Sequence, residues 1–134
     1  MPAISQLVKD YKDRVNIVAV NSNDASPTTD DSSPEDAPEL MTAFTEQWDL
    51  ECAYVFDEDQ SIAQEYGAVC TPEFYVVNED GIIVYHGELD PSHTSNELMP
   101  TGSSLRHALD LTLIDKPITW EPNPSFGCSV KWKL

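Results

Sequence analysis

The chain has 134 residues, enough for one domain with a single core. It carries 24 acidic and 7 basic side chains, which gives a formal net charge of −17. So much negative charge opposes binding to phosphate backbones and anionic lipid headgroups, so we expect neither a nucleic-acid partner nor a membrane partner. The charge either keeps the protein soluble or provides an acidic docking face for a basic partner, and composition leaves both readings open.

The N-terminal residues lack the basic and apolar segments of a signal peptide, and no apolar run is long enough to span a membrane. The three cysteines, Cys52, Cys70 and Cys128, are an odd number, which favours a reducing compartment or redox chemistry over a disulfide-stapled scaffold. We therefore expect a cytoplasmic protein. The cysteines and histidines are dispersed, so we expect no metal site and no other cofactor.

The first half of the chain predicts alternating helices and strands. Apolar residues recur at helical spacing over residues 3–13. The β-branched run at 15–20 is typical of a strand buried on both faces of a parallel sheet. Residues 21–37 form a polar loop, whose carboxylates do not have the spacing of an EF-hand and are interpreted as solvated. A helix at about 38–48 follows.

The second half predicts a short strand, a brief helix, a hairpin and a last helix. The strand covers 52–56, and the helix at 58–66 ends at Gly67. An Asp-Gly pair between two β-rich runs is a strong hairpin signal. The sequence therefore predicts a hairpin of strands at 73–78 and 82–86, with Asp80-Gly81 in its turn. A helix at 103–114 and an extended, Pro-rich tail at 117–134 follow. The element order is that of an α/β protein.

Thr71-Pro72 stands immediately before an apolar strand that continues into the Asp80-Gly81 hairpin, and this arrangement resembles the thioredoxin superfamily. The resemblance implies a cis Thr71–Pro72 peptide bond. Within the thioredoxin superfamily, the sequence is most similar to the peroxiredoxin-like (AhpC/TSA-redoxin-like) branch. This similarity lies in four separate segments, at 18–24, 34–39, 66–72 and 124–132. The implied structure is a thioredoxin-like, three-layer α/β/α fold over residues 1–116, followed by the tail at 117–134.

Proteins of that branch carry a strand and a Cys-x-x-Cys-type motif before the segments that match here, and this sequence contains neither. Pro2 matches a proline that family members place inside the active-site helix. The resemblance therefore implies a fold truncated at the N-terminus. We expect little disulfide reductase activity from these residues, because exchange needs a reactive thiolate and a second, resolving thiol.

Cys70 and Cys128 are the remaining candidates for catalysis. Cys70 stands two residues before Pro72, next to the active site of the implied fold, although a buried structural role is the alternative. Cys128 lies in the tail and is either a resolving partner for Cys70 or inert. Cys52 opens a predicted buried strand and is interpreted as structural. Thr71 and Pro72 are the expected substrate-binding residues, since a strand edge there can pair with a polypeptide.

The resemblance implies a thiol-disulfide oxidoreductase or an antioxidant, peroxidase-like protein acting on protein thiols or disulfides, or on peroxides. The alternatives are a non-catalytic thioredoxin-like binding module and a fragment of a longer redox protein. The absent strand would lie between the strands at 15–20 and 73–78, and its loss leaves backbone groups without partners. We therefore expect either direct pairing of these two strands or, preferably, a homodimer.

Overall fold

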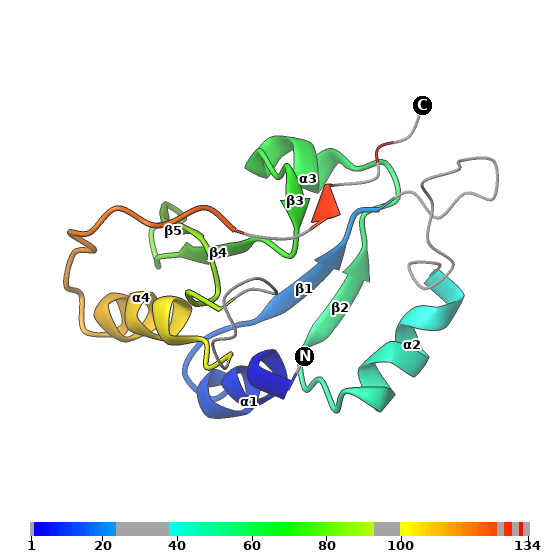
Figure 1. Cartoon of the computed structure of the whole chain (residues 1–134), viewed down its shortest axis with the longest axis horizontal. Coiled ribbons are helices and arrows are strands. Elements are labelled where there is room, and N and C mark those ends of the chain that lie inside the picture. Colours follow the sequence, from blue (N-terminus) through cyan, green and yellow to red (C-terminus); the bar gives the residue numbers. More distant parts are fainter. Residues whose placement is uncertain (1, 24–37, 93–99, 126–127, 130–131, 133–134) are drawn as a thin grey trace. The chain divides into compact units, whose positions relative to one another are not determined.

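The computed structural model describes residues 2–23, 38–92, 100–125, 128–129 and 132, and has mixed α/β architecture (Figure 1). The chain forms two compact units, one of Met1–Val69 with Ser129–Leu134 and one of Cys70–Cys128. The loop carboxylates weighed above as a calcium site lie outside the described residues. In the described part, no helix has the length and apolarity needed to cross a bilayer.

The first unit contains a parallel strand pair and three helices. Strands β1 (Val18–Asn21) and β2 (Ala53–Phe56) pair in register, with Val18 opposite Ala53 and Asn21 opposite Phe56. The helices are α1 (Pro2–Tyr11), α2 (Pro38–Gln47) and α3 (Ser61–Tyr66). The predicted strand at 15–20 begins later in the structure. The reason is a turn after α1, in which Arg14 N and Val15 N both donate to Tyr11 O.

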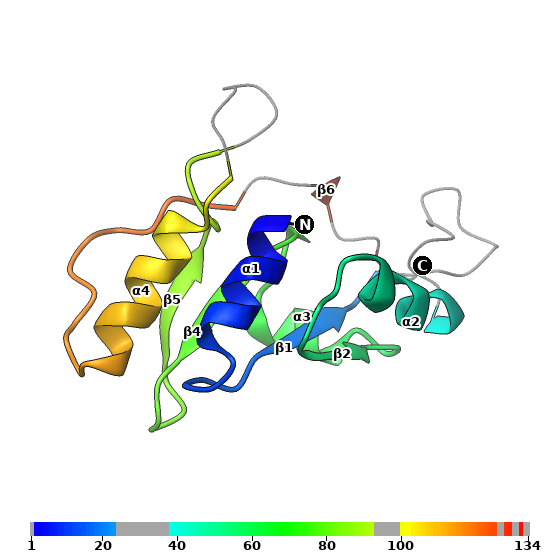
Figure 2. The same ribbon diagram turned by 90° about the horizontal axis from the view of Figure 1, so that it is seen from below.

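Helix α1 is amphipathic, and its apolar residues Leu7, Val8 and Tyr11 are buried as the periodicity predicts. Polar side chains of α1 contact residues 48–51, the segment that follows α2. The Ser5 hydroxyl donates to Trp48 O at 2.7 Å, and Lys9 and Lys12 pair with carboxylates of that segment. Both ion pairs are largely solvent-exposed and stabilise little. Burial of the apolar face therefore holds α1 in place. Figure 2 shows the ribbon of α1 from a second direction.

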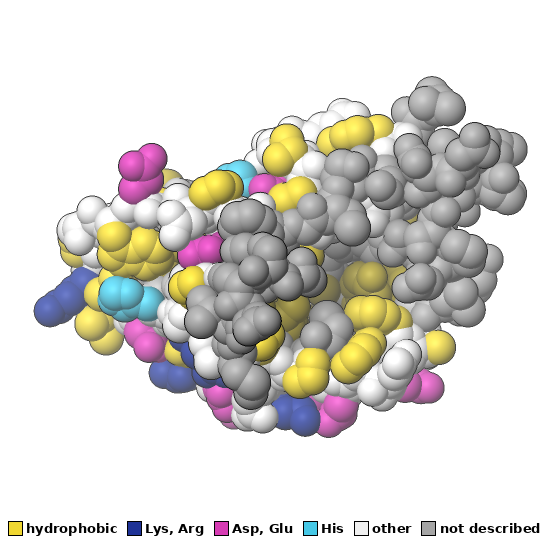
Figure 3. Space-filling model, viewed as in Figure 1, with side chains coloured by type: hydrophobic (Ala, Val, Ile, Leu, Met, Phe, Trp, Pro, Cys, Tyr) yellow, Lys and Arg dark blue, Asp and Glu magenta, His cyan; other side chains and the backbone are white. Residues whose placement is uncertain are grey.

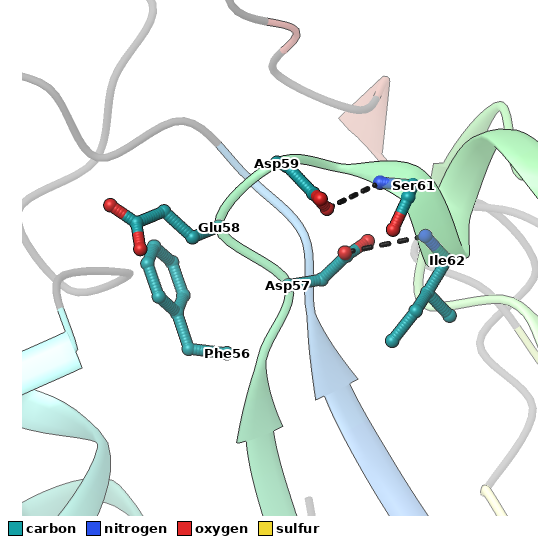
Figure 4. Close-up of a pocket in the computed structure, with 6 residues that line it drawn as sticks. All are labelled: Phe56, Asp57, Glu58, Asp59, Ser61 and Ile62. Atoms are coloured by element: carbon teal, nitrogen blue, oxygen red, sulfur yellow. Dashed lines mark hydrogen bonds between the residues drawn. The ribbon is translucent and has the colours of Figure 1, made fainter.

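Helix α3 begins three residues later than predicted because the Asp57 carboxylate caps it. Asp57 is buried and accepts hydrogen bonds from Ile62 N, Ala63 N and the Ser22 hydroxyl at 3.3, 3.0 and 2.7 Å. Figure 4 shows Asp57 and Asp59 turned toward the start of the helix. Residue Gln60 takes a left-handed conformation just before the helix. Gly67, also left-handed, ends the helix as predicted.

The second unit is built on the predicted hairpin. Strands β4 (Phe74–Val77) and β5 (Ile83–Gly87) are antiparallel, with a register irregularity between Val76 and Val77. The Asn78 side chain accepts from Asp80 N and Ile82 N, both at 3.0 Å, and Gly81 has φ +79°. A residue with a Cβ adopts this φ only with strain, so glycine suits the turn. The hairpin prediction is confirmed.

Helix α4 (Ser103–Leu113) contributes Leu105, Ala108 and Leu109 to the core, together with Val76 and Tyr85 of the hairpin. Two short strands, β3 (Cys70–Thr71) and β6 (Cys128–Ser129), also pair with each other. The sequence did not predict either strand.

The Asp90 carboxylate fixes the chain that leads into α4. It is buried and accepts hydrogen bonds from Thr101 N and Gly102 N at 2.8 and 2.7 Å, and from both N–H and hydroxyl of Ser92. Burial alone would raise the pKa of Asp90, but the hydrogen bonds outweigh it and hold the pKa below its usual value.

Among the described strands, β1 pairs only with β2 and β4 only with β5. The strands predicted at 15–20 and 73–78 therefore do not pair with each other, and the expectation of direct pairing is wrong.

Replacing Asp57 with alanine should destabilise the first unit by about 1–3 kcal/mol, because three donors lose their acceptor. Urea unfolding followed by circular dichroism measures this change in the free energy of unfolding. Glu58→Ala is the matched control, since Glu58 is exposed and adjacent. Equal effects of the two substitutions would contradict the capping role of Asp57.

Asp90→Asn should lower the free energy of unfolding at neutral pH. The folded-state pKa of Asp90 is depressed, so its stabilisation is fully present above the unfolded value of ~3.9 and is lost as pH falls through the folded value. The difference between wild type and variant should therefore shrink as the pH falls below ~3.9. Urea titrations at several pH values test this, and a difference that grows toward acid would show the sign to be wrong.

Candidate functional site

Cys70 begins β3 and is half-buried. Its Sγ donates a weak hydrogen bond to Ser125 O at 3.6 Å. Burial raises the pKa of the Cys70 thiol, and the negative charge of Glu73 raises it further. At neutral pH this side chain is therefore mainly a protonated thiol, which is a weaker nucleophile than a thiolate.

The peptide bond between Thr71 and Pro72 is cis, which agrees with the prediction. Pro72 is exposed and Thr71 is half-buried. Thus the two expected substrate-binding residues follow Cys70 directly, and the second of them is accessible to solvent.

A polar and aromatic cluster lies just beyond Pro72. The largely buried Glu73 carboxylate contacts His86 Nε2 at 3.2 Å and accepts from the Tyr75 hydroxyl at 3.4 Å. The rings of Tyr75 and His86 stack with centroids 4.2 Å apart. Sequence reasoning missed this cluster. The hairpin register contains the signal, because Tyr75 lies directly opposite His86.

The C-terminal tail packs against β5 rather than extending freely over the surface. Asn123 O accepts from Glu88 N at 3.0 Å, and the Ser125 hydroxyl donates to Gly87 O at 2.7 Å. A Cβ at residue 87 would lie 2.7 Å from Asn123 O, so this close approach requires glycine. The tail then continues to β6, which pairs with β3.

Trp120 anchors the middle of the tail. Its ring stacks on His107 at 5.4 Å between centroids and meets Tyr85 edge-on at 5.6 Å. Burial, followed by the charge of Glu88, raises the pKa of Tyr85 to about 12. The Tyr85 hydroxyl therefore stays protonated and donates to Glu88 O.

The predicted site residues lie in and directly beside the paired strands β3 and β6. Cys70, Thr71 and Pro72 lie together in the second unit, and Cys128 lies in β6, the strand paired with β3. The side chain of Cys128 is outside the described part of the structure. Cys52 precedes β2 in the first unit, and burial raises the pKa of its thiol although a backbone hydrogen bond from Ala19 opposes the shift.

Cys52 and Cys70 are free thiols. Of the residues that the structure describes, no three His, Cys, Asp or Glu side chains form a group that could hold a metal ion. A pocket at the C-terminal end of β2 is lined by Phe56, Ile62 and acidic side chains (Figure 4). Asp57 and Asp59 already accept hydrogen bonds from backbone N–H groups at the start of α3. We therefore interpret the acidic side chains of this pocket as caps of the helix.

Comparison with solved structures identifies the fold. An uncharacterised conserved protein from Geobacillus kaustophilus is 42% identical, with a TM-score of 0.89 over 97% of this chain and 67% of its own. A hypothetical protein from Sinorhizobium meliloti 1021 is 34% identical, with a TM-score of 0.91 over 98% of this chain and 70% of its own. The α/β fold is thioredoxin-like, as predicted.

A curated relative, the thioredoxin-like protein YneN of Bacillus subtilis (strain 168), is 30% identical over 83 residues, which are 62% of this chain. The match covers 43% of YneN, so the chain spans less than half the length of that relative. The model of the AhpC/TSA family matches residues 1–86. Because this match covers more than half of the chain, the chain belongs to the AhpC/TSA family.

Proposed function

We propose that this chain takes part in thiol-disulfide exchange, with Cys70 and Cys128 as the exchanging pair. Membership of the AhpC/TSA family and similarity to a thioredoxin-like protein support a thiol redox role in general. The observation that carries the finer proposal is the pairing of β3, which begins with Cys70, with β6, which begins with Cys128.

Strand spacing supports the pair. Neighbouring strands lie about 4.8 Å apart, and the Cα atoms of a disulfide are usually ~4.4–6.8 Å apart. Cys70 and Cys128 thus belong to strands whose separation suits a disulfide. Cys52 belongs to the first unit, so the proposal assigns it no part in the exchange.

The reaction consumes one external disulfide. A thiolate of the pair attacks one sulfur of that disulfide. A mixed disulfide with the attacking cysteine forms as the external S–S bond breaks, and one external thiolate leaves. The second cysteine loses its proton to solvent and displaces the other external thiolate, which forms the Cys70–Cys128 bond. Two electrons pass from the pair to the external disulfide, which becomes two thiols, and the reverse reaction reduces a disulfide substrate.

We take disulfides as the substrate class because the second cysteine of the pair can resolve a mixed disulfide. Attack by Cys70 should be slow, because attack on a disulfide or on a peroxide requires a thiolate, and burial and Glu73 keep Cys70 protonated at neutral pH. The substrate chain would contact Thr71 and the exposed Pro72, which follow Cys70 directly. The acidic composition favours substrates that carry basic residues near their disulfide.

Oxidation of the full chain with a small disulfide such as oxidised glutathione should produce an intramolecular Cys70–Cys128 bond. Alkylation of the remaining thiols, followed by non-reducing peptide mass mapping, identifies the linked residues. The Cys52→Ser variant should still form the bond, whereas Cys70→Ser and Cys128→Ser should each accumulate a glutathione adduct. A disulfide that includes Cys52, or the absence of any disulfide, would contradict the proposal and favour a non-catalytic binding module.

The Cys70 thiol should be alkylated slowly at neutral pH. In a Cys52→Ser, Cys128→Ser background, the midpoint of iodoacetamide reactivity should lie at higher pH in the folded chain than in urea, because burial and Glu73 raise the pKa. Glu73→Gln should shift the midpoint to lower pH. Glu79→Gln, an exposed position in the hairpin turn, is the control. If the midpoint is the same in the folded chain and in urea, the described environment of Cys70 is wrong.

A further inference from the structure

The strand edge expected to receive a substrate chain is occupied by the chain's own tail. Strand β3, which consists of Cys70 and Thr71, pairs with β6, and the described part of the chain places no other strand beside β3. Shortly before β6, Ser125 O accepts the weak hydrogen bond from Cys70 Sγ at 3.6 Å. The tail therefore contacts this region twice, once along β3 and once at the thiol itself.

A polypeptide substrate of Cys70 needs the same place. An extended chain binds a strand edge through alternating N–H and C=O groups, and β6 already pairs with one edge of β3. The second edge does not remove the conflict, because the substrate must still bring a sulfur atom to Cys70 Sγ, beside Ser125. A small disulfide has no backbone to pair and needs only the exposed part of the half-buried thiol.

Hydrogen bonds away from the thiol hold the tail in this position. The Ser125 hydroxyl donates to Gly87 O at 2.7 Å, and Glu88 N donates to Asn123 O at 3.0 Å. Asn123 Nδ2 also donates to the Glu88 carboxylate at 3.2 Å. We call residues 123–125 together with β6 the strap. Substitutions at these bonds can loosen the strap and leave the residues of β3 unchanged.

We propose that the strap determines which disulfides reach Cys70: it admits small ones while it is docked and polypeptide ones only when it is displaced. The inference rests on the proposed exchange at Cys70 and assigns the substrate class to contacts outside the thiol pair. Displacement also carries Cys128 away from Cys70, since Cys128 belongs to β6. A mixed disulfide with a polypeptide should therefore last longer than one with a small thiol.

Trp120 fixes the tail upstream of the strap. Its indole stacks on His107 and meets Tyr85 edge-on. Figure 3, in the view of Figure 1, shows apolar and histidine side chains at the surface where α4 and the adjoining tail lie. Aromatic packing of this kind outlasts the loss of a few hydrogen bonds. The strap therefore opens about a segment that stays attached.

Two matched probes separate the substrate classes. One is the amide of N-acetylcysteine and the other is a short uncharged peptide with blocked ends, each with its cysteine joined by a disulfide to thionitrobenzoate. Attack by Cys70 breaks that disulfide, links the probe cysteine to Cys70 and releases coloured thionitrobenzoate. The full chain with Cys52→Ser and Cys128→Ser reports attack by Cys70 alone, so the result does not depend on a Cys70–Cys128 bond.

The small probe should react about tenfold faster than the peptide or more, because the peptide must first break the hydrogen bonds of the strap. Ser125→Ala removes the bond to Gly87 O and should lower this ratio of rates by about two- to tenfold, the factor that one hydrogen bond contributes to an equilibrium. Ser103→Ala, which removes an exposed hydroxyl at the start of α4, should leave the ratio unchanged.

Equal rates for the two probes, a small probe that does not react, or the same ratio in Ser125→Ala as in the parent chain overturns the proposal. If the probes behave as expected but oxidation forms no Cys70–Cys128 bond, the proposed thiol pair fails and the control of access by the strap stands.

Hydrogen exchange of the two Cys70 adducts tests displacement without any substitution in the strap. The Glu88 amide, which donates to Asn123 O, should exchange faster in the peptide adduct than in the small adduct. The Ile82 amide, which donates to the Asn78 side chain in the hairpin turn, should exchange alike in both. Equal protection of the Glu88 amide in both adducts would show that a chain binds at Cys70 with the strap docked, and would overturn the proposal.

Discussion

The second unit depends on the hydrogen bonds of one buried residue, Glu88. Its N–H donates to Asn123 O, its carbonyl accepts from the Tyr85 hydroxyl, and its carboxylate accepts from Ser104 Oγ and Asn123 Nδ2 at 3.3 and 3.2 Å. These bonds join the end of β5, the start of α4 and the tail. Because the tail is attached here, it leads to β6 beside β3, and the proposed thiol pair depends on that path.

The sequence predicted the features that have local signals. The hairpin follows from Asp80-Gly81 between two apolar runs, and α4 follows from its helical spacing. The boundaries of β1 and α3 were less accurate. Hydrogen bonds to Tyr11 O delay the start of the strand, and the Asp57 carboxylate sets the start of the helix. Such tertiary and capping contacts carry no periodicity that a sequence pattern can reveal.

The candidate site was predicted in part. The positions of Cys70, Thr71 and Pro72 followed from a motif, whereas the pairing of β3 with β6 joins two-residue strands far apart in sequence. Strands so short have no recognisable pattern. The contacts of Glu73 with Tyr75 and His86 could have been predicted by counting cross-strand positions from the hairpin turn.

The environments of the two described thiols bear on the proposed exchange. Burial is the leading cause of the raised pKa at both Cys52 and Cys70. Neither is therefore a low-pKa thiolate of the kind found at the start of a helix in reactive sites. Under the proposed function, the exchange with a disulfide is therefore expected to be slow.

A redox titration of the full chain in glutathione buffers tests the central claim, that Cys70 and Cys128 act as one couple. Trapping the thiols with acid and alkylating them gives the oxidised fraction at each ratio of reduced to oxidised glutathione. We expect a single two-electron transition that persists in Cys52→Ser and disappears in both Cys70→Ser and Cys128→Ser. Independent glutathione adducts on the two cysteines, with no shared transition, would contradict the claim.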